Sequence, residues 1–163
     1  MPYSDGTYTP PTGAENAAAG QVIRSATWNT IFTDISAGLT TIGQGVSLEF
    51  VIRDGPSTAI VPGLKGFIEV PMALTINSWK ILADRVGSIV IDIWKSPFGS
   101  FPPTIANTIT GSALPTITSA QSNSSSALTG WTTSLSKADI MAFNVNSATA
   151  CQQVTISLDC GRN

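Results

Sequence analysis

SIVIDIW, residues 88–94, is the strongest strand signal in the chain, because isoleucine and valine dominate it and both suit a pleated, half-buried surface. Within this run, Asp92 shares one face of the strand with Val90 and Trp94. A carboxylate there is either exposed to solvent beside an exposed tryptophan or buried with a partner. We favour the first interpretation, a polar position on the outer face of the sheet.

Comparable strand signals flank this run on both sides. In VSLEFVIR, residues 46–53, apolar and polar side chains alternate as they do in a half-buried strand. Pro71 interrupts the run 66–76, which is therefore an edge strand, a bulged strand or two separate strands. Further strands are expected at residues 58–61, 79–82, 128–131, 138–145 and 153–158, with turns at 54–56 and 84–87.

These signals predict a mainly β fold for residues 45–160. Roughly seven to nine short strands are typical of an antiparallel β-sandwich of the jelly-roll type, although a barrel would produce the same signals. One long connection, residues 95–127, is rich in proline, serine and threonine, with a turn of helix expected near residues 105–109. Connections of this length more often have a functional role or form an interface than serve only as linkers.

Residues 25–43 predict an amphipathic α-helix that precedes the β domain. Its apolar side chains are spaced four and three residues apart, which is the a/d pattern of a coiled coil. They are Trp28, Phe32, Ile35, Leu39 and Ile42. The helix is either a short stem in which these residues form an oligomer seam or a helix packed on its own domain. The pattern spans too few heptads to decide between the two.

Residues 1–24 are predicted to form an extended arm. Pro10 and Pro11 favour a polyproline-like path, and Tyr3 and Tyr8 are the only large side chains. Such an arm has no core of its own and becomes ordered only by lying on another protein, the alternative being a disordered tail. The aromatic pair and the low charge favour an attachment arm.

Composition excludes several classes of protein. Only 11% of the 163 residues are charged and the net charge is −2, with basic residues scattered singly, so we expect no nucleic-acid partner. No apolar run approaches the roughly 20 residues of a membrane span, and the first residues lack the features of a signal peptide. We therefore expect synthesis and folding in a cytoplasm and no contact with a membrane.

The residues needed for most catalytic chemistry are absent. The chain has no histidine, its ten carboxylates are dispersed, and no phosphate-binding or calcium loop is present, so we expect no enzyme, no cofactor and no metal. Cys151 and Cys160 are interpreted as free, partly buried thiols, with a disulfide across a terminal hairpin as the alternative.

Aromatic side chains near loops and strand ends are the candidate ligand-facing residues. They are Trp94, Phe98, Phe101 and Trp131, with Asp92 beside the first of them. Aromatic rings flanked by polar residues can stack on sugar rings. We favour the alternative that the tryptophans are core or interface anchors.

Four stretches of the sequence resemble tailed-bacteriophage virion appendage proteins. The opening, YTPPTGAENAAAGQVIRSATWNTIFTDISAGLT, is similar to a leader that precedes variable distal domains in such proteins. The later stretches GLKGFIEVPMALTINSWKILAD, GSIVIDIWKSPFGSFPPTIANTI and LTGWTTSLSKADIMAFNVNSAT are similar to a module of phage tail fibres and related appendages. These motifs are not catalytic, so their specificity lies in their length and order, and they bring no ligand residues with them.

The resemblance implies a structural component on the surface of a phage particle, made in the cytoplasm of a bacterial host. It implies a homotrimer with a β-rich distal domain that contacts other virion proteins of the capsid, neck or tail. Because the chain has no long fibrous shaft, a small fibre, spike or decoration attached through the N-terminus is expected. The alternative is a module of a tail fibre that binds a host receptor or surface glycan.

Overall fold

The computed structural model describes residues 3–4, 7–8, 33 and 45–163, and the chain divides into two units, Met1–Ile42 and Gly43–Asn163. In the first unit, β1 (Tyr3–Ser4) pairs with β2 (Thr7–Tyr8) in antiparallel register. The rest of the predicted arm, including Pro10 and Pro11, lies outside the described residues. So does the helix predicted over residues 25–43, except Thr33, which has helical backbone. The predicted seam lies outside them too: Trp28, Phe32, Ile35, Leu39 and Ile42.

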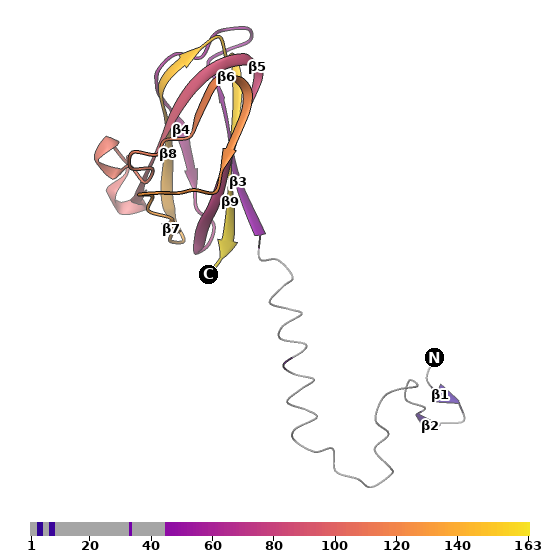
Figure 1. Ribbon diagram of the computed structural model, residues 1–163. Coiled ribbons are helices and arrows are strands. Elements are labelled where there is room, and N and C mark those ends of the chain that lie inside the picture. The colour runs from indigo at the N-terminus through magenta and orange to yellow at the C-terminus, as the bar shows by residue number, and fades with distance from the viewer. Residues whose placement is uncertain (1–2, 5–6, 9–32, 34–44) are drawn as a thin grey trace. The chain divides into compact units, whose positions relative to one another are not determined.

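The second unit is a single antiparallel sheet with short 3-10 turns. Its elements are β3 (Gly45–Arg53), β4 (Gly63–Glu69), β5 (Leu74–Pro97), η1 (Phe98–Ser100), η2 (Ile105–Asn107), β6 (Thr116–Ser125), β7 (Ser134–Leu135), β8 (Asp139–Thr149) and β9 (Gln153–Arg162). The strand order is β3-β9-β5-β8-β4, and β6 and β7 also pair with β5 (Figure 1). The mainly β fold is therefore confirmed.

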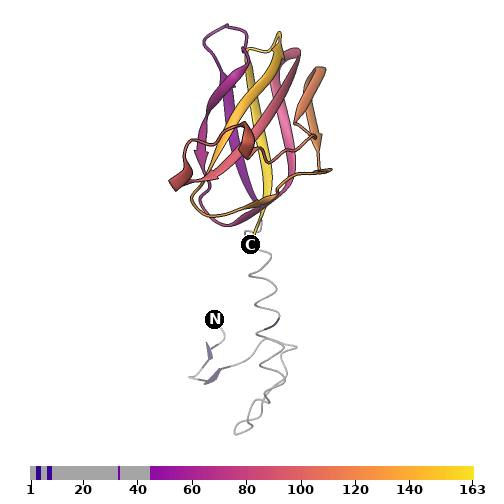
Figure 2. The same ribbon diagram turned by 90° about the vertical axis from the view of Figure 1, so that its left-hand side faces the viewer.

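The long strand β5 causes the sheet to curl. Residues 74–83 of β5 pair with β9, whereas residues 88–97 pair with β8. Strand β6 follows β5 across the junction, where the register shifts twice around Gly87. A Cβ atom at Gly87 would lie 2.5 Å from the carbonyl oxygen of Thr149, so only glycine lets the β8–β9 turn approach β5 this closely. The two parts of the sheet thus share β5 and fold toward each other (Figure 2).

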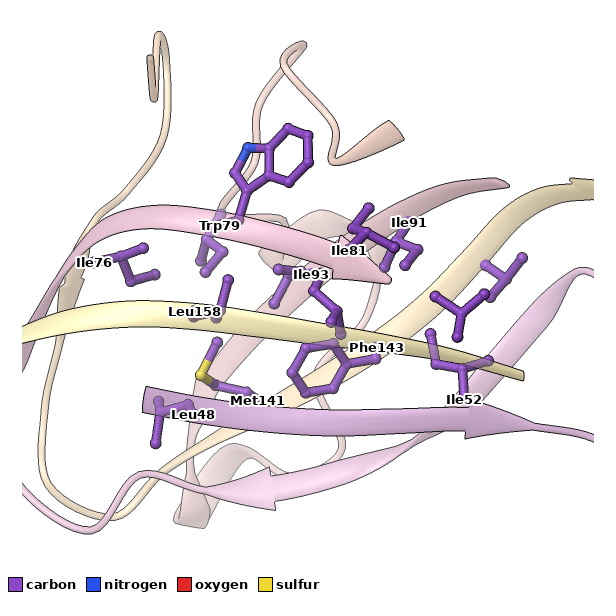
Figure 3. Close-up of a cluster of buried hydrophobic side chains, with 14 of the residues drawn as sticks. Leu48, Ile52, Ile76, Trp79, Ile81, Ile91, Ile93, Met141, Phe143 and Leu158 are labelled. Carbon is purple, nitrogen blue, oxygen red and sulfur yellow. The ribbon is translucent and has the colours of Figure 1, made fainter. Parts of the chain in front are cut away.

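The hydrophobic core lies inside the curl. Strands β3, β5, β8 and β9 each contribute alternate side chains, such as Ile52, Ile81 and Leu158, which are fully buried (Figure 3). The rings of Phe50 on β3 and Phe143 on β8 stack with centroids 4.5 Å apart. This contact joins two strands that are not hydrogen-bonded neighbours, so packing of side chains holds the curl closed on this side.

Several strand predictions are confirmed. Residues 46–53 form β3, with Leu48 and Ile52 buried and the polar side chains exposed. The run interrupted by Pro71 is two strands, β4 and β5, of which β4 is at an edge. The predicted strand 153–158 falls within β9, the predicted strand 138–145 overlaps β8, which begins at Asp139, and the predicted turn of helix lies at η2.

Other predictions are wrong. The expected turn at 84–87 is continuous β5, because pairing of the residues before and after it carries the strand through a shift of register and overrides the local turn signal. Residues 58–61 are a loop in which Ile60 is buried and its N–H donates to the carbonyl of Cys151. Residues 128–131 contain a turn rather than a strand, and β6 lies unforeseen inside the long connection. Among the described residues, no helix combines the length and the apolar character that crossing a membrane requires.

Candidate functional site

The segment between β5 and β6, residues 98–115, is called the excursion below. It leaves the sheet after Pro97, forms η1 and η2, and then runs back along β5 in the opposite direction. The N–H of Ile109 donates to the carbonyl of Ile93 at 2.8 Å, and the N–H of Ile91 donates to the carbonyl of Pro115 at 2.9 Å. The excursion is therefore held against β5 by backbone hydrogen bonds even though it contains no regular strand.

A buried carboxylate locks this segment in place. Asp92 on β5 is only 5% exposed, and each of its oxygens accepts hydrogen bonds. The indole N–H of Trp94 donates to Oδ2 at 2.7 Å, and the hydroxyls of Thr108 and Thr110 donate to Oδ1 at 2.6 and 2.7 Å. Bonds to a charged acceptor are the stronger class, so Asp92 ties the excursion firmly to the sheet.

The expectation that Asp92 occupies a solvent-facing position is thus wrong. The donors that allow its burial, Thr108 and Thr110, lie 16 and 18 residues further along the chain. Neither threonine was predicted as a partner of Asp92. The one available signal was the alternation in NTITG, residues 107–111, where two hydroxyl side chains flank an isoleucine.

The two candidate tryptophans are half-buried, and their indole N–H groups are bonded within the protein. Trp94 is half-buried with its N–H bonded to Asp92, and Trp131 is half-buried with its N–H donating to the carbonyl of Ala113 at 2.8 Å. The N–H of Thr132 donates to the carbonyl of Ile109, so the chain around Trp131 is attached to the excursion as well. The polar edge of each indole is therefore engaged within the protein.

The two phenylalanines of the excursion are exposed. Phe98 is 72% and Phe101 is 51% accessible, and Phe101 contacts Phe67 of β4 edge-to-face with ring centroids 4.9 Å apart. These three rings are called the aromatic ledge. Ile105, on η2, is 70% accessible as well. Large apolar side chains that stay exposed on an anchored segment are typical of a contact surface.

Two other carboxylates, Asp139 and Asp54, serve structural contacts. Asp139 is buried and accepts from Lys95 Nζ at 3.0 Å and from the N–H of Ser136 at 2.8 Å. Both oxygens of Asp54 lie 2.7 Å from Lys65 Nζ, and hydrogen bonding to this ammonium group is the main reason that the pKa of Asp54 is lowered. Across residues 45–163 and the few described before them, no three acidic or sulfur side chains are grouped to hold a metal ion.

Both cysteines are free and buried, as expected from the sequence. Cys160 lies on β9 and Cys151 in the turn that precedes it. Burial raises the pKa of the Cys160 thiol to about 11 and also raises that of Cys151. Neither thiol is therefore prepared to act as a nucleophile at neutral pH.

The structure thus places the candidate ligand-facing residues in three different surroundings. Asp92 and Trp94 bond to each other on β5, and Asp92 also bonds to the excursion. Trp131 bonds to Ala113 from the neighbouring loop, and Phe98 and Phe101 are exposed on the excursion. Comparisons of the chain with protein-family models, curated proteins and solved structures find no match.

Proposed function

We propose that this chain is a structural component of a bacteriophage particle, a small fibre, spike or decoration attached through its N-terminal residues. The assignment to a phage rests on the resemblance of the sequence. The proposal that its role is contact rather than catalysis rests on the aromatic ledge, whose rings are exposed. Phe67 belongs to β4, and Phe98 and Phe101 belong to the excursion, which Asp92 ties to β5.

The arrangement of the ledge supports a preorganised protein contact. Exposed aromatic rings bind partners most effectively when little conformational freedom is lost on binding. The excursion meets this condition, since backbone hydrogen bonds to β5 and the two bonds from Thr108 and Thr110 to Asp92 hold it before any partner arrives. The ledge therefore suits a neighbouring protein of the particle.

The architecture of the attached parts belongs to the same proposal. The β unit is proposed to be a jelly-roll-like sandwich, which the sharing of β5 and the Phe50–Phe143 stack support. Residues 1–24 are proposed to dock on the virion, and residues 25–43 to form a helical stem of a homotrimer at the virion surface. Weak charge over the whole chain suits a surface that packs against neighbours.

The test is incorporation into particles that lack the natural chain and are complemented with variants. Deleting residues 1–24 should abolish incorporation, because the arm would supply the attachment. The double substitution Phe98→Ser and Phe101→Ser should leave attachment intact but weaken the contact with the neighbouring protein, measured as loss of the chain during mild denaturant washing. Normal incorporation of the truncated chain would contradict attachment by the arm, and equal retention of the double variant would contradict the role of the ledge.

The alternative, a glycan-binding module built on the same residues, is less well supported. A sugar site at Asp92 and Trp94 would need polar groups that are already bonded to Thr108, Thr110 and each other. Of the candidate rings, Phe98 and Phe101 are the most exposed and remain available for stacking. If glycan binding were lost in the phenylalanine double variant while incorporation stayed normal, this alternative would replace the contact proposal.

A further inference from the structure

A separate polar pocket lies at the end of the β unit where β3 finishes. It has a volume of about 240 Å³ and is lined by residues from three segments that are distant in sequence. They are Arg53, Gly55, Ser57, Asp84, Gln152 and Gln153. Strand β3 has nine residues, so the pocket lies roughly 26 Å along the strand from Gly45, its first residue.

The wall of this pocket is built by hydrogen bonds to Asp84. Its Oδ1 accepts the backbone N–H groups of Gln152 and Gln153 at 3.0 and 3.1 Å, and its Oδ2 accepts from Arg85 Nε at 2.8 Å. The bond from Gln152 is the main reason that the pKa of Asp84 is lowered to about 2. Asp84 is thus an ionised clamp between β5 and the β8–β9 turn.

The Gln152 side chain joins the loop after β3 to Asp84 and Arg85. Its Oε1 accepts from Arg85 at 2.5 Å, and its Nε2 donates to the carbonyl of Ser57 at 2.9 Å. Ser57 has a φ of 62°, which is uncommon for a residue other than glycine and is often found at functional sites. The loop after β3 is therefore held in one conformation over the pocket.

Arg53 is the group of the pocket that is free to bind a ligand. Its Nε donates to the carbonyl of Gly55 at 3.2 Å, which orients the side chain. Within residues 45–163, the terminal nitrogens of Arg53 make no hydrogen bond, and the ion pairs join other residues. The side-chain amide of Gln153 and the hydroxyl of Ser57 are unbonded there too. The pocket therefore offers one unpaired guanidinium beside two neutral hydrogen-bonding groups.

We propose that this pocket binds a singly charged, hydroxylated carboxylate of the uronic acid type. A guanidinium presents two parallel N–H groups that match a carboxylate in bidentate geometry, and Arg53 fills this role. Gln153 and Ser57 are placed to bond hydroxyl groups on the same ligand. Since Arg85 balances Asp84, the pocket has a single excess positive charge, which suits a monoanion better than a phosphate dianion. This binding does not depend on the proposed role in a particle.

The test is a titration of the full ¹⁵N-labelled chain, followed by NMR, with three probes. They are glucuronic acid, glucose as the neutral analogue and glucose 6-phosphate as the phosphate analogue. We expect saturable shifts of the amide signals of Ser57, Gln152 and Gln153 with glucuronic acid, at a Kd on the order of millimolar because the pocket is open and small. Glucose should bind at least about tenfold more weakly, and glucose 6-phosphate should not bind more tightly than glucuronic acid.

Two arginine variants make the assignment specific. Arg53→Gln should weaken glucuronic acid binding by about tenfold or more, because it removes the charge and the fork of donors. Arg162→Gln is the matched control, since Arg162 is an exposed arginine at the opposite end of the sheet and its loss should change nothing. Equal binding of glucose, tighter binding of the phosphate, unchanged affinity of the Arg53 variant or no saturable shift with glucuronic acid would each overturn the proposal.

Discussion

Replacing Asp92 with asparagine should loosen the excursion while leaving the shape of the side chain nearly unchanged. The amide oxygen can still accept from Thr108 and Thr110, but the new NH₂ group would face the indole N–H of Trp94, which is also a donor. One charge-assisted bond is lost and two are weakened. Since a hydrogen bond to a charged group contributes about 1.5–3 kcal/mol, we expect a loss of about 2–4 kcal/mol in the free energy of unfolding.

Alanine at the same position should cost more. Asp92→Ala leaves the donors of Trp94, Thr108 and Thr110 without their acceptor in a buried site, for which a loss of about 3–5 kcal/mol is typical. In urea this loss lowers the unfolding midpoint by roughly 1–3 M. Asp159→Asn is the matched control, because Asp159 is an exposed aspartate of β9 and its replacement should change stability by less than about 0.5 kcal/mol.

Hydrogen exchange distinguishes a local from a global effect. The amides of Ile109 and Thr132 bond across the excursion, so they should exchange faster in Asp92→Asn well before the amides of β9 do. A double-mutant cycle with Thr110→Val should show coupling of about 1 kcal/mol or more, since the two side chains share one bond. The reasoning would be refuted if Asp92→Asn matched Asp159→Asn in both stability and exchange.

Three further predictions concern other parts of the chain. The pKa of Asp84 in the folded protein is lowered to about 2 from 3.8, so the ionised carboxylate should stabilise the fold fully above about pH 4, and this stabilisation should be lost as the pH falls through 2. The difference in urea unfolding midpoint between the natural chain and Asp84→Asn should therefore disappear over that pH range. Gly87→Ala should destabilise the fold by about 1–3 kcal/mol, because the new Cβ would lie 2.5 Å from a carbonyl oxygen, whereas Gly99→Ala, with open space around it, should leave the melting temperature nearly unchanged. If residues 25–43 form a trimer stem, the natural chain should have a solution mass three times 16.9 kDa. Ile35→Asp should then give a monomer whose β unit stays folded, because it places a charge in the seam. A monomeric natural chain would contradict the stem.

Strands were predicted correctly where apolar and polar side chains alternate along the sequence and the apolar ones are buried. Leu48 and Ile52 alternate with polar residues along β3, and the structure buries them as expected. Strand β6 was missed because TITSAQSNSS carries mostly polar side chains, and the partner that makes it a strand is the backbone of β5. Gly87 shows the same limit, since its turn-like surroundings are overridden by its own pairing with β6 and by the pairing of β5 with β8 from Ser88 onward.

The candidate site, like the strands, was predicted from the sequence only in part. The sequence identified Asp92 and the aromatic residues as the ones to examine, and it favoured anchors over sugar-stacking for the tryptophans. It did not reveal that Thr108 and Thr110 satisfy Asp92, or that Phe67 joins Phe101 in the aromatic ledge. The pocket around Arg53 was missed as well, because its residues come from three segments that carry no shared motif.

The sequence by itself determined that this chain is mainly β, where most of its strands lie and which side chains of β3 enter the core. These properties depend on a period of two residues, which can be read from neighbouring positions. Only the tertiary structure decided that one continuous β5 serves both parts of the sheet and that Asp92 is buried. The physical reason is that backbone pairing and the satisfaction of a buried carboxylate depend on donors and acceptors far away in the chain.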